Sequence, residues 1–71
     1  MKTYVGLTDD LERRREEHGR PAGWKWYGPF HSEAAARDWE EEMLRAGFVG
    51  GPGGAGWMYG YTYPITEDTV E

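Results

Sequence analysis

The stretch Lys2-Thr3-Tyr4-Val5-Gly6-Leu7, continued by Thr8-Asp9-Asp10-Leu11-Glu12, decides the fold. Tyr4 and Val5 are β-formers, so residues 2–7 are predicted to form a short strand. Asp9 and Glu12 have capping-box spacing, which predicts a helix that starts directly after the strand. That helix should run to about His18 and end at Gly19, with Pro21 just beyond.

Two more strands and one more helix are expected downstream. Residues 24–30 are rich in aromatic side chains and predict a strand, with Pro29 ending its pairing. Ser32 is a good N-cap for a helix over residues 33–45, with Gly47 as its stop. After a glycine-rich connector at 50–56, residues 57–63 predict the last strand.

The expected fold class is therefore α/β of the α+β type, with a small three-stranded sheet and two helices in the order β-α-β-α-β. The chain has 71 residues, which allows one domain. We expect residues 1–66 to form that domain and residues 67–71 to be an acidic tail.

Aromatic side chains are expected to supply much of the core. The chain has four Trp, five Tyr and two Phe, and such rings replace bulk in a short domain. By the strand period of two, Trp24, Trp26 and Phe30 should face the core. The same period puts Trp57, Tyr59, Tyr61 and Tyr63 on one face of the last strand, either as core or as a platform on which bases stack. In so small a domain the core interpretation is favoured.

Charge restricts the expected partners. The net charge is −5, and all of it arises in residues 21–71, which makes the chain a poor general binder of phosphate backbones. Arg13, Arg14 and Arg15 form the one basic cluster, so contact with DNA or RNA is expected there. The chain lacks cysteine, a signal-peptide pattern and a membrane-span pattern. A cytoplasmic protein without a membrane partner is therefore expected.

The first helix carries unusual polar residues. Leu11, Arg14, Arg15 and His18 share one face by their spacing. If Leu11 points to the core, Arg14 and His18 lie on or beside the inward face. The alternative is a solvated helix whose charges pair with one another, in which Asp10 pairs with Arg14.

Glu40 differs from its acidic neighbours on the second helix. Glu41 has Arg37 and Arg45 four residues to either side and belongs to a salt-bridged outer face, whereas Glu40 has Ala36 and Leu44 one turn away. Glu40 is therefore at the edge of the apolar stripe, either as a metal ligand or as a boundary residue.

These residues resemble the second half of the GIY-YIG nuclease signature. Tyr4-Val5-Gly6 is followed by Thr8-Asp9-Asp10-Leu11 and then by Arg14 and His18 at the family spacing. Phe30-x-Ser32 leading into Ala36-x-x-x-Glu40 is similar to the family helix that carries a metal-binding Glu. The resemblance covers about residues 2–46.

The resemblance implies hydrolysis of a phosphodiester bond in DNA or RNA. It implies that Glu40 holds one divalent ion, Mg²⁺ or Mn²⁺, and that Arg14 offsets charge on the phosphate. It also implies that Tyr4 activates or orients the attacking water and that His18 assists positioning or proton transfer.

The family's first strand, with a second active-site Tyr, has no counterpart before Met1. The position after Tyr4-Val5-Gly6 is often basic in the family and is Leu7 here. We hypothesise that residues 57–63 pair beside residues 2–7 and fill the missing strand's place, so that Tyr59 or Tyr61 supplies the phenol.

Three functions remain open from the sequence. The first is a metal-dependent endonuclease, or one half-site of a larger one. The second is a catalytically silent GIY-YIG-fold module that binds a protein partner, and the third is a single-stranded nucleic-acid binder using the aromatic stripe.

Overall fold

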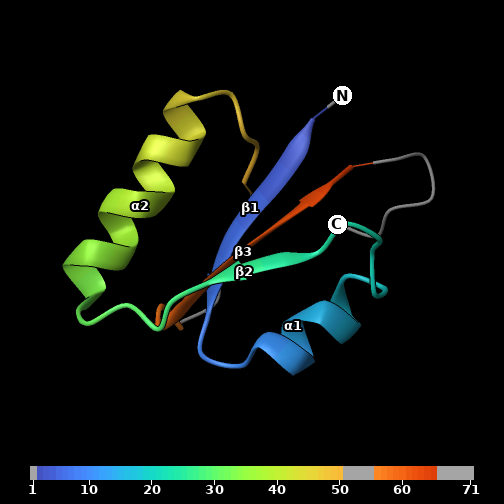
Figure 1. Cartoon of the computed structure of the whole chain (residues 1–71), viewed down its shortest axis with the longest axis horizontal. Coiled ribbons are helices and arrows are strands. Elements are labelled where there is room, and N and C mark those ends of the chain that lie inside the picture. Colours follow the sequence, from blue (N-terminus) through green and yellow to red (C-terminus); the bar gives the residue numbers. More distant parts are fainter. Residues whose placement is uncertain (1, 51–55, 66–71) are drawn as a thin grey trace.

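The computed structural model describes residues 2–50 and 56–65 and contains three strands and two helices in these ranges (Figure 1). In chain order these are β1 (Thr3–Thr8), α1 (Leu11–Glu17), β2 (Lys25–Tyr27), α2 (Glu33–Arg45) and β3 (Tyr59–Pro64). The predicted order β-α-β-α-β is confirmed. Residues 51–55 of the connector predicted at 50–56, and the tail predicted at 67–71, lie outside the described residues.

The strands form one antiparallel sheet in the order β1-β3-β2. β3 pairs with β1 from Thr3↔Pro64 to Thr8↔Tyr59. The hypothesis that the C-terminal strand pairs beside residues 2–7 is thus confirmed. A parallel bridge between Tyr4 and Val49 adds a short contact outside the three strands.

The two helices cover opposite faces of the sheet (Figure 1). Leu11 of α1 packs on a core formed by Tyr4, Tyr61 and Tyr63. Gly60 and Tyr61 are adjacent in β3 and so point to opposite faces. A Cβ at Gly60 would fall on the ring of Trp39, so α2 lies on the other face.

Glycine is needed where rings cross the sheet. A side chain at Gly6 would overlap the phenol of Tyr61. Gly6 and Tyr61 are direct cross-strand partners, so the large ring occupies the space that the missing side chain leaves. The close approach of Trp39 to Gly60 follows the same rule on the α2 face.

Side-chain caps start both helices, and one differs from the prediction. Ser32 accepts the backbone N–H of Ala35 and is the N-cap of α2, as predicted. The N-cap of α1 is Asp10, which accepts the N–H of Arg13, so the prediction of Asp9 was wrong by one residue. Asp9 instead accepts the N–H groups of Trp57 and Met58 through one carboxylate oxygen.

The strand predicted at 24–30 is shorter than expected. β2 has three residues, all exposed, and Trp26 is 56% exposed, so its predicted place in the core was wrong. The sheet has a covered face under each helix, but β2 is one of its two edge strands and α1 is only seven residues long. A helix as short as α1 does not extend over the ring of Trp26.

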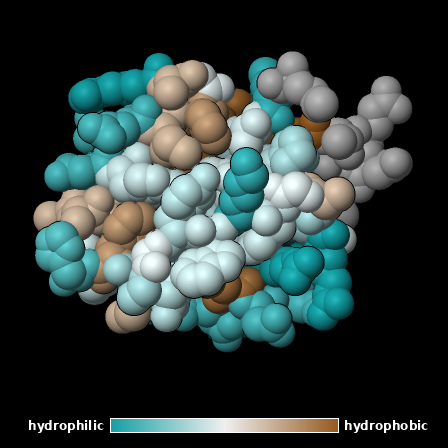
Figure 2. Space-filling model, viewed as in Figure 1, coloured by the Kyte–Doolittle hydropathy of each residue, from teal (hydrophilic) through white to brown (hydrophobic). Residues whose placement is uncertain are grey.

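The molecular surface follows this arrangement. In Figure 2, hydrophilic side chains lie over both helices, with hydrophobic ones among them on the side of α2, whereas the middle of the view, over the strands, has intermediate hydropathy. No helix within residues 2–50 and 56–65 is long and apolar enough to cross a membrane.

Gly60→Ala should lower the free energy of unfolding by about 1–3 kcal/mol, because the new methyl group overpacks the contact with Trp39. Urea unfolding measures this. Trp39→Leu should relieve the overlap, so the double variant should lose less than the sum of the two single losses. Additive losses would contradict the proposed contact.

Candidate functional site

A buried cluster of tyrosine and histidine side chains joins α1 to the sheet. We define the tyrosine–histidine cluster as Tyr4, His18, Tyr61 and Tyr63. All four are less than 9% exposed. Their rings lie face to face or tilted, with His18 at 5.0–5.5 Å from the three tyrosine ring centroids.

His18 links two phenols through its two ring nitrogens. Nε2 lies 3.0 Å from the hydroxyl of Tyr61, and Nδ1 lies 2.9 Å from the hydroxyl of Tyr63. A neutral imidazole has one N–H donor and one acceptor nitrogen. One phenol therefore accepts a hydrogen bond from His18, and the other donates one to it.

The strand alternation and the C-cap of α1 explain why these groups meet. Tyr4 and Tyr63 are direct cross-strand partners, and Tyr61 follows Tyr63 on the same face by the period of two. His18 caps α1, where its backbone N–H donates to the carbonyl of Arg14. Of the two alternatives for the first helix, the structure shows the one in which Leu11 points to the core and His18 lies on the inward side.

Trp24 closes the cluster on the side of β2. Its ring is stacked on Tyr61 with centroids 4.6 Å apart and planes 11° apart. Offset stacking of this kind adds to the energy of burial. The sequence predicted Trp24 in the core, but it did not predict Tyr63 as a hydrogen-bond partner of His18, although the period of two had placed Tyr63 beside Tyr61.

Arg14 lies at the margin of the cluster. Its side chain is 21% exposed and donates to the carboxylate of Glu17 at 3.1 Å. The predicted alternative partner, Asp10, caps the helix instead. Partial burial acts to lower the pKa of Arg14, but the hydrogen bond to Glu17 and the nearby phenols of Tyr61 and Tyr4 outweigh it and raise that pKa.

Burial dominates the chemistry of Tyr61. It raises the pKa of the phenol far above the usual tyrosine value, Tyr4 adds to this increase, and the guanidinium of Arg14 opposes it. Tyr61 is therefore a neutral phenol that donates or accepts hydrogen bonds, rather than a phenolate.

Glu40 lies on α2, on the side of the sheet opposite the cluster. Viewed along the axis of α2, the fully buried Ala36 lies between the directions of Trp39 and Glu40. Trp39 reaches inward to β3 and to Tyr27 of β2, and α2 packs mainly on β1. Glu40 is therefore on the opposite flank of α2, toward the outer edge of β1.

The other predicted site residues are less enclosed. Glu40 is partly buried and pairs with Arg37 at 3.8 Å. Arg13 and Arg15 are exposed on α1. Tyr59 lies at the start of β3 with its ring 6.1 Å from that of Trp26, away from His18. The structure thus brings together Tyr4, Arg14, His18 and Tyr61. Tyr59 and Glu40 do not contact these four residues.

Tyr61 is 1% exposed and Tyr63 is fully buried, which confirms the core interpretation for these two members of the aromatic stripe, whereas Trp57 and Tyr59 are only partly buried. Neither ring is available for a base to stack on.

Comparison with models of protein families, with curated proteins and with solved structures finds no match to this chain. Among residues 2–50 and 56–65, no three His, Cys, Asp or Glu side chains are grouped so that they could hold a metal ion.

His18→Ala should lower the free energy of unfolding by about 2–4 kcal/mol, because it removes two buried hydrogen bonds and leaves a cavity among the rings. Urea unfolding measures the loss. The other histidine of the chain, His31, is exposed, so His31→Ala is the matched control and should change stability by less than about 0.5 kcal/mol. Equal losses would contradict the account of the cluster.

Stability should fall as the pH rises above about 10, where tyrosines of the unfolded chain lose their protons. Folded Tyr61 keeps its proton to higher pH because its pKa is raised, so the folded state binds more protons in this range and unfolding becomes easier. Urea unfolding between pH 8 and 11 should show a shallower decline for Tyr61→Phe than for the unmodified chain. Tyr27→Phe, which removes an exposed phenol, is the control, and an unchanged slope for Tyr61→Phe would refute the assignment.

Proposed function

We propose that this chain is a GIY-YIG-like, metal-dependent endonuclease that hydrolyses phosphodiester bonds of nucleic acid. The observation that carries the proposal is the meeting of Tyr4, Arg14, His18 and Tyr61 on one face of the sheet. These residues come from three elements and from both ends of the chain. The resemblance to the family had selected Tyr4, Arg14 and His18 by spacing, and Tyr61 came from the hypothesis that residues 57–63 fill the missing strand's place.

In this proposal Arg14 binds the phosphate. Its guanidinium is partly exposed, and the carboxylate of Glu17 already occupies one side of it at 3.1 Å. Two oxygens of a phosphate can accept the paired N–H groups of a guanidinium, as the two oxygens of a carboxylate can. Substrate therefore competes with Glu17, and the charge of Arg14 stabilises the negative charge that grows on the phosphate during hydrolysis.

The phenols and the imidazole orient this face. Tyr4 is at the rim of the cluster with 8% of its surface exposed, and it orients the attacking water. His18 has both nitrogens bonded to phenols, so its role here is to hold Tyr61 in place. The pairing of β3 with β1 supports the idea that β3 fills the place of the missing family strand and that Tyr61 supplies its phenol.

The chemistry of Glu40 fits a hard divalent cation. Mg²⁺ takes one or two carboxylate oxygens and keeps several waters, and Glu40 offers one partly buried carboxylate whose ion pair with Arg37 is long at 3.8 Å. Bound there, Mg²⁺ or Mn²⁺ would supply Lewis-acid polarisation of a phosphoryl oxygen. Glu40 lies on the α2 face of the sheet, whereas Tyr4 and Arg14 lie on the α1 face, so the proposal requires a substrate that reaches both faces around the outer edge of β1.

A second candidate is a catalytically silent module of the same fold that binds a protein partner. The observation that favours it is the burial of Tyr61, Tyr63 and His18, whose polar atoms bond to one another. A core that is stabilised in this way keeps these residues whether or not the domain cuts nucleic acid.

Cleavage assays with paired variants test the proposal. Supercoiled plasmid, single-stranded DNA and RNA are incubated with Mg²⁺ or Mn²⁺. Glu40→Gln and Arg14→Gln should each lower the rate by about 100-fold or more, because one binds the ion and the other the phosphate. Glu41→Gln and Arg45→Gln are matched controls, because these two residues form an exposed ion pair on α2, with 2.5 Å between Arg45 Nη2 and Glu41 Oε1.

Controls that keep full activity while Glu40→Gln and Arg14→Gln lose it would support the endonuclease. If the folded chain cuts none of the three substrates, or if Glu41→Gln costs as much as Glu40→Gln, the endonuclease proposal fails. The silent module then becomes the better account.

A further inference from the structure

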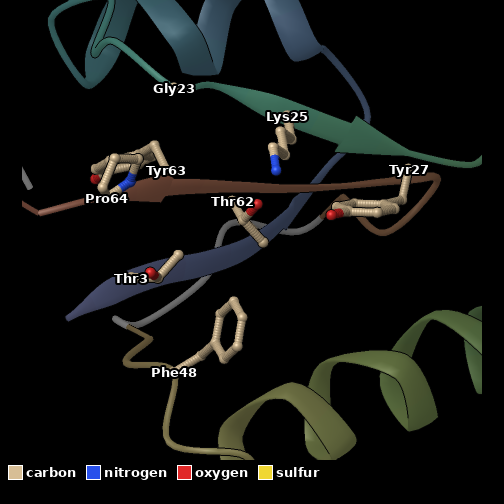
Figure 3. Close-up of a pocket in the computed structure, with 8 residues that line it drawn as sticks. All are labelled: Thr3, Gly23, Lys25, Tyr27, Phe48, Thr62, Tyr63 and Pro64. Atoms are coloured by element: carbon tan, nitrogen blue, oxygen red, sulfur yellow. The ribbon is translucent and has the colours of Figure 1, made fainter. Parts of the chain in front are cut away.

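A pocket opens on the face of the sheet that α2 only partly covers (Figure 3). Its volume is about 400 Å³, which lies in the range of small-molecule sites. The side chains that line it come from all three strands and from the loop after α2, and they include Thr3, Lys25, Tyr27, Phe48, Thr62 and Pro64.

The sequence explains why this space is not filled. α2 is anchored near one end of the sheet, where Trp39 packs on Gly60 and against Tyr27. Toward the other end, the floor of the pocket is built from Thr3 and Thr62, whose side chains are short, and Thr62 is 4% exposed. The ring of Phe48 forms a wall opposite β2 (Figure 3).

Polar groups of the pocket converge above this floor. In Figure 3 the amine of Lys25 and the hydroxyl of Tyr27 both point toward Thr62. Lys25 and Thr62 are cross-strand partners, so the amine and the threonine hydroxyl share one side of the sheet. Within residues 2–50 and 56–65 the structure gives Lys25 no carboxylate partner.

Each part of the pocket suits a different part of a ligand. The rings of Phe48, Tyr27 and Pro64 offer flat apolar walls on which a planar ring packs. The ammonium of Lys25 and the hydroxyls of Tyr27 and Thr62 can donate hydrogen bonds to an anion. On a chain of net charge −5, Lys25 gives this pocket a positive charge that no carboxylate of the described residues offsets.

We propose that this pocket binds a small planar aromatic ligand that carries a carboxylate or a phosphate and has about the size of a mononucleotide. The aromatic ring lies between Phe48 and the side chains of β2, and the anionic group lies on Lys25. This site is on the opposite face of the sheet from Tyr4 and Tyr61, and it does not depend on endonuclease activity.

Amide NMR spectra with four probes test the proposal. Adenosine 5′-monophosphate and 2-naphthoate carry a ring and an anion, whereas adenosine and inorganic phosphate carry only one of the two. A ring-plus-anion probe should bind with a Kd of about 1 mM or tighter. Its shifts should be confined to Thr3, Lys25, Tyr27, Phe48 and Thr62, and adenosine and phosphate should bind at least about tenfold more weakly.

Two variants and a control separate the parts of the site. Lys25→Met keeps the length of the side chain but removes its charge, and it should weaken binding about tenfold. Phe48→Ala should also weaken binding about tenfold, because it removes the ring against which the ligand packs. Arg45→Met, at an exposed cation of α2, should leave binding unchanged.

Binding of the nucleotide alone identifies a mononucleotide site, and binding of naphthoate alone identifies an aromatic carboxylate site. Binding of both probes supports a site for any planar aromatic anion of this size. The proposal is overturned if neither probe saturates, if phosphate alone binds as tightly as the nucleotide, or if Lys25→Met binds like the unmodified chain. None of these results depends on whether nucleic acid is cut.

Discussion

Pairing of β3 with both other strands is the constraint on which the rest of the structure depends. β1 and β2 do not pair with each other, and each is held in the sheet only through β3. Both helices also attach to this strand, α1 through the rings around Tyr61 and α2 through the contact of Trp39 with Gly60.

The contacts of β3 extend beyond its ladder. The carboxylate of Asp9, in the turn before α1, accepts the N–H groups of Trp57 and Met58 as the chain enters β3. At the other end, the N–H of Ile65 donates to the carbonyl of Lys2. The first and last described parts of a 71-residue chain are thus joined at both ends of one strand pair, and these contacts of high sequence separation set the register of the sheet.

The same burial that stabilises the tyrosine–histidine cluster limits its chemistry. Buried polar groups must bond to one another, because each lost bond costs about 1–3 kcal/mol. His18 meets this need for Tyr61 and Tyr63, and the cost of ionising Tyr61 makes it a neutral group. In the proposed function, the reaction at this face therefore depends on the groups at its rim, Arg14 and Tyr4.

Local patterns in the sequence predicted local features of the fold. The N-cap at Ser32 and the bounds of α2 follow from spacing and capping rules, and the inward position of His18 was one of the two alternatives that the spacing left open. The pairing of β3 with β1 was also expected from the sequence. That expectation came from the resemblance, whose family has a first strand with no counterpart in this sequence, and no local sequence pattern indicated the pairing. Whether β3 is the functional equivalent of that strand stays a prediction.

Features that depend on distant contacts were not predictable in this way. Asp9 and Asp10 both suit an N-cap, and only the approach of residues 57 and 58 gives Asp9 another role. Trp26 has the alternation of a core residue, yet it lies on an edge strand that the short α1 does not cover. The pocket around Lys25 exists because α2 is anchored at one end of the sheet, which no single segment encodes.

The central claim, that Glu40 and the β1 edge form one metal-dependent site, is tested most directly by amide NMR during titration with Mn²⁺. The paramagnetic ion broadens signals near the place where it binds, and no substrate is needed. The account predicts that broadening at low Mn²⁺ is confined to Glu40 and to the neighbouring part of β1 around Leu7, and that Glu40→Gln abolishes it. Weak broadening spread over exposed acids such as Asp38, Glu41 and Glu42 would contradict the account.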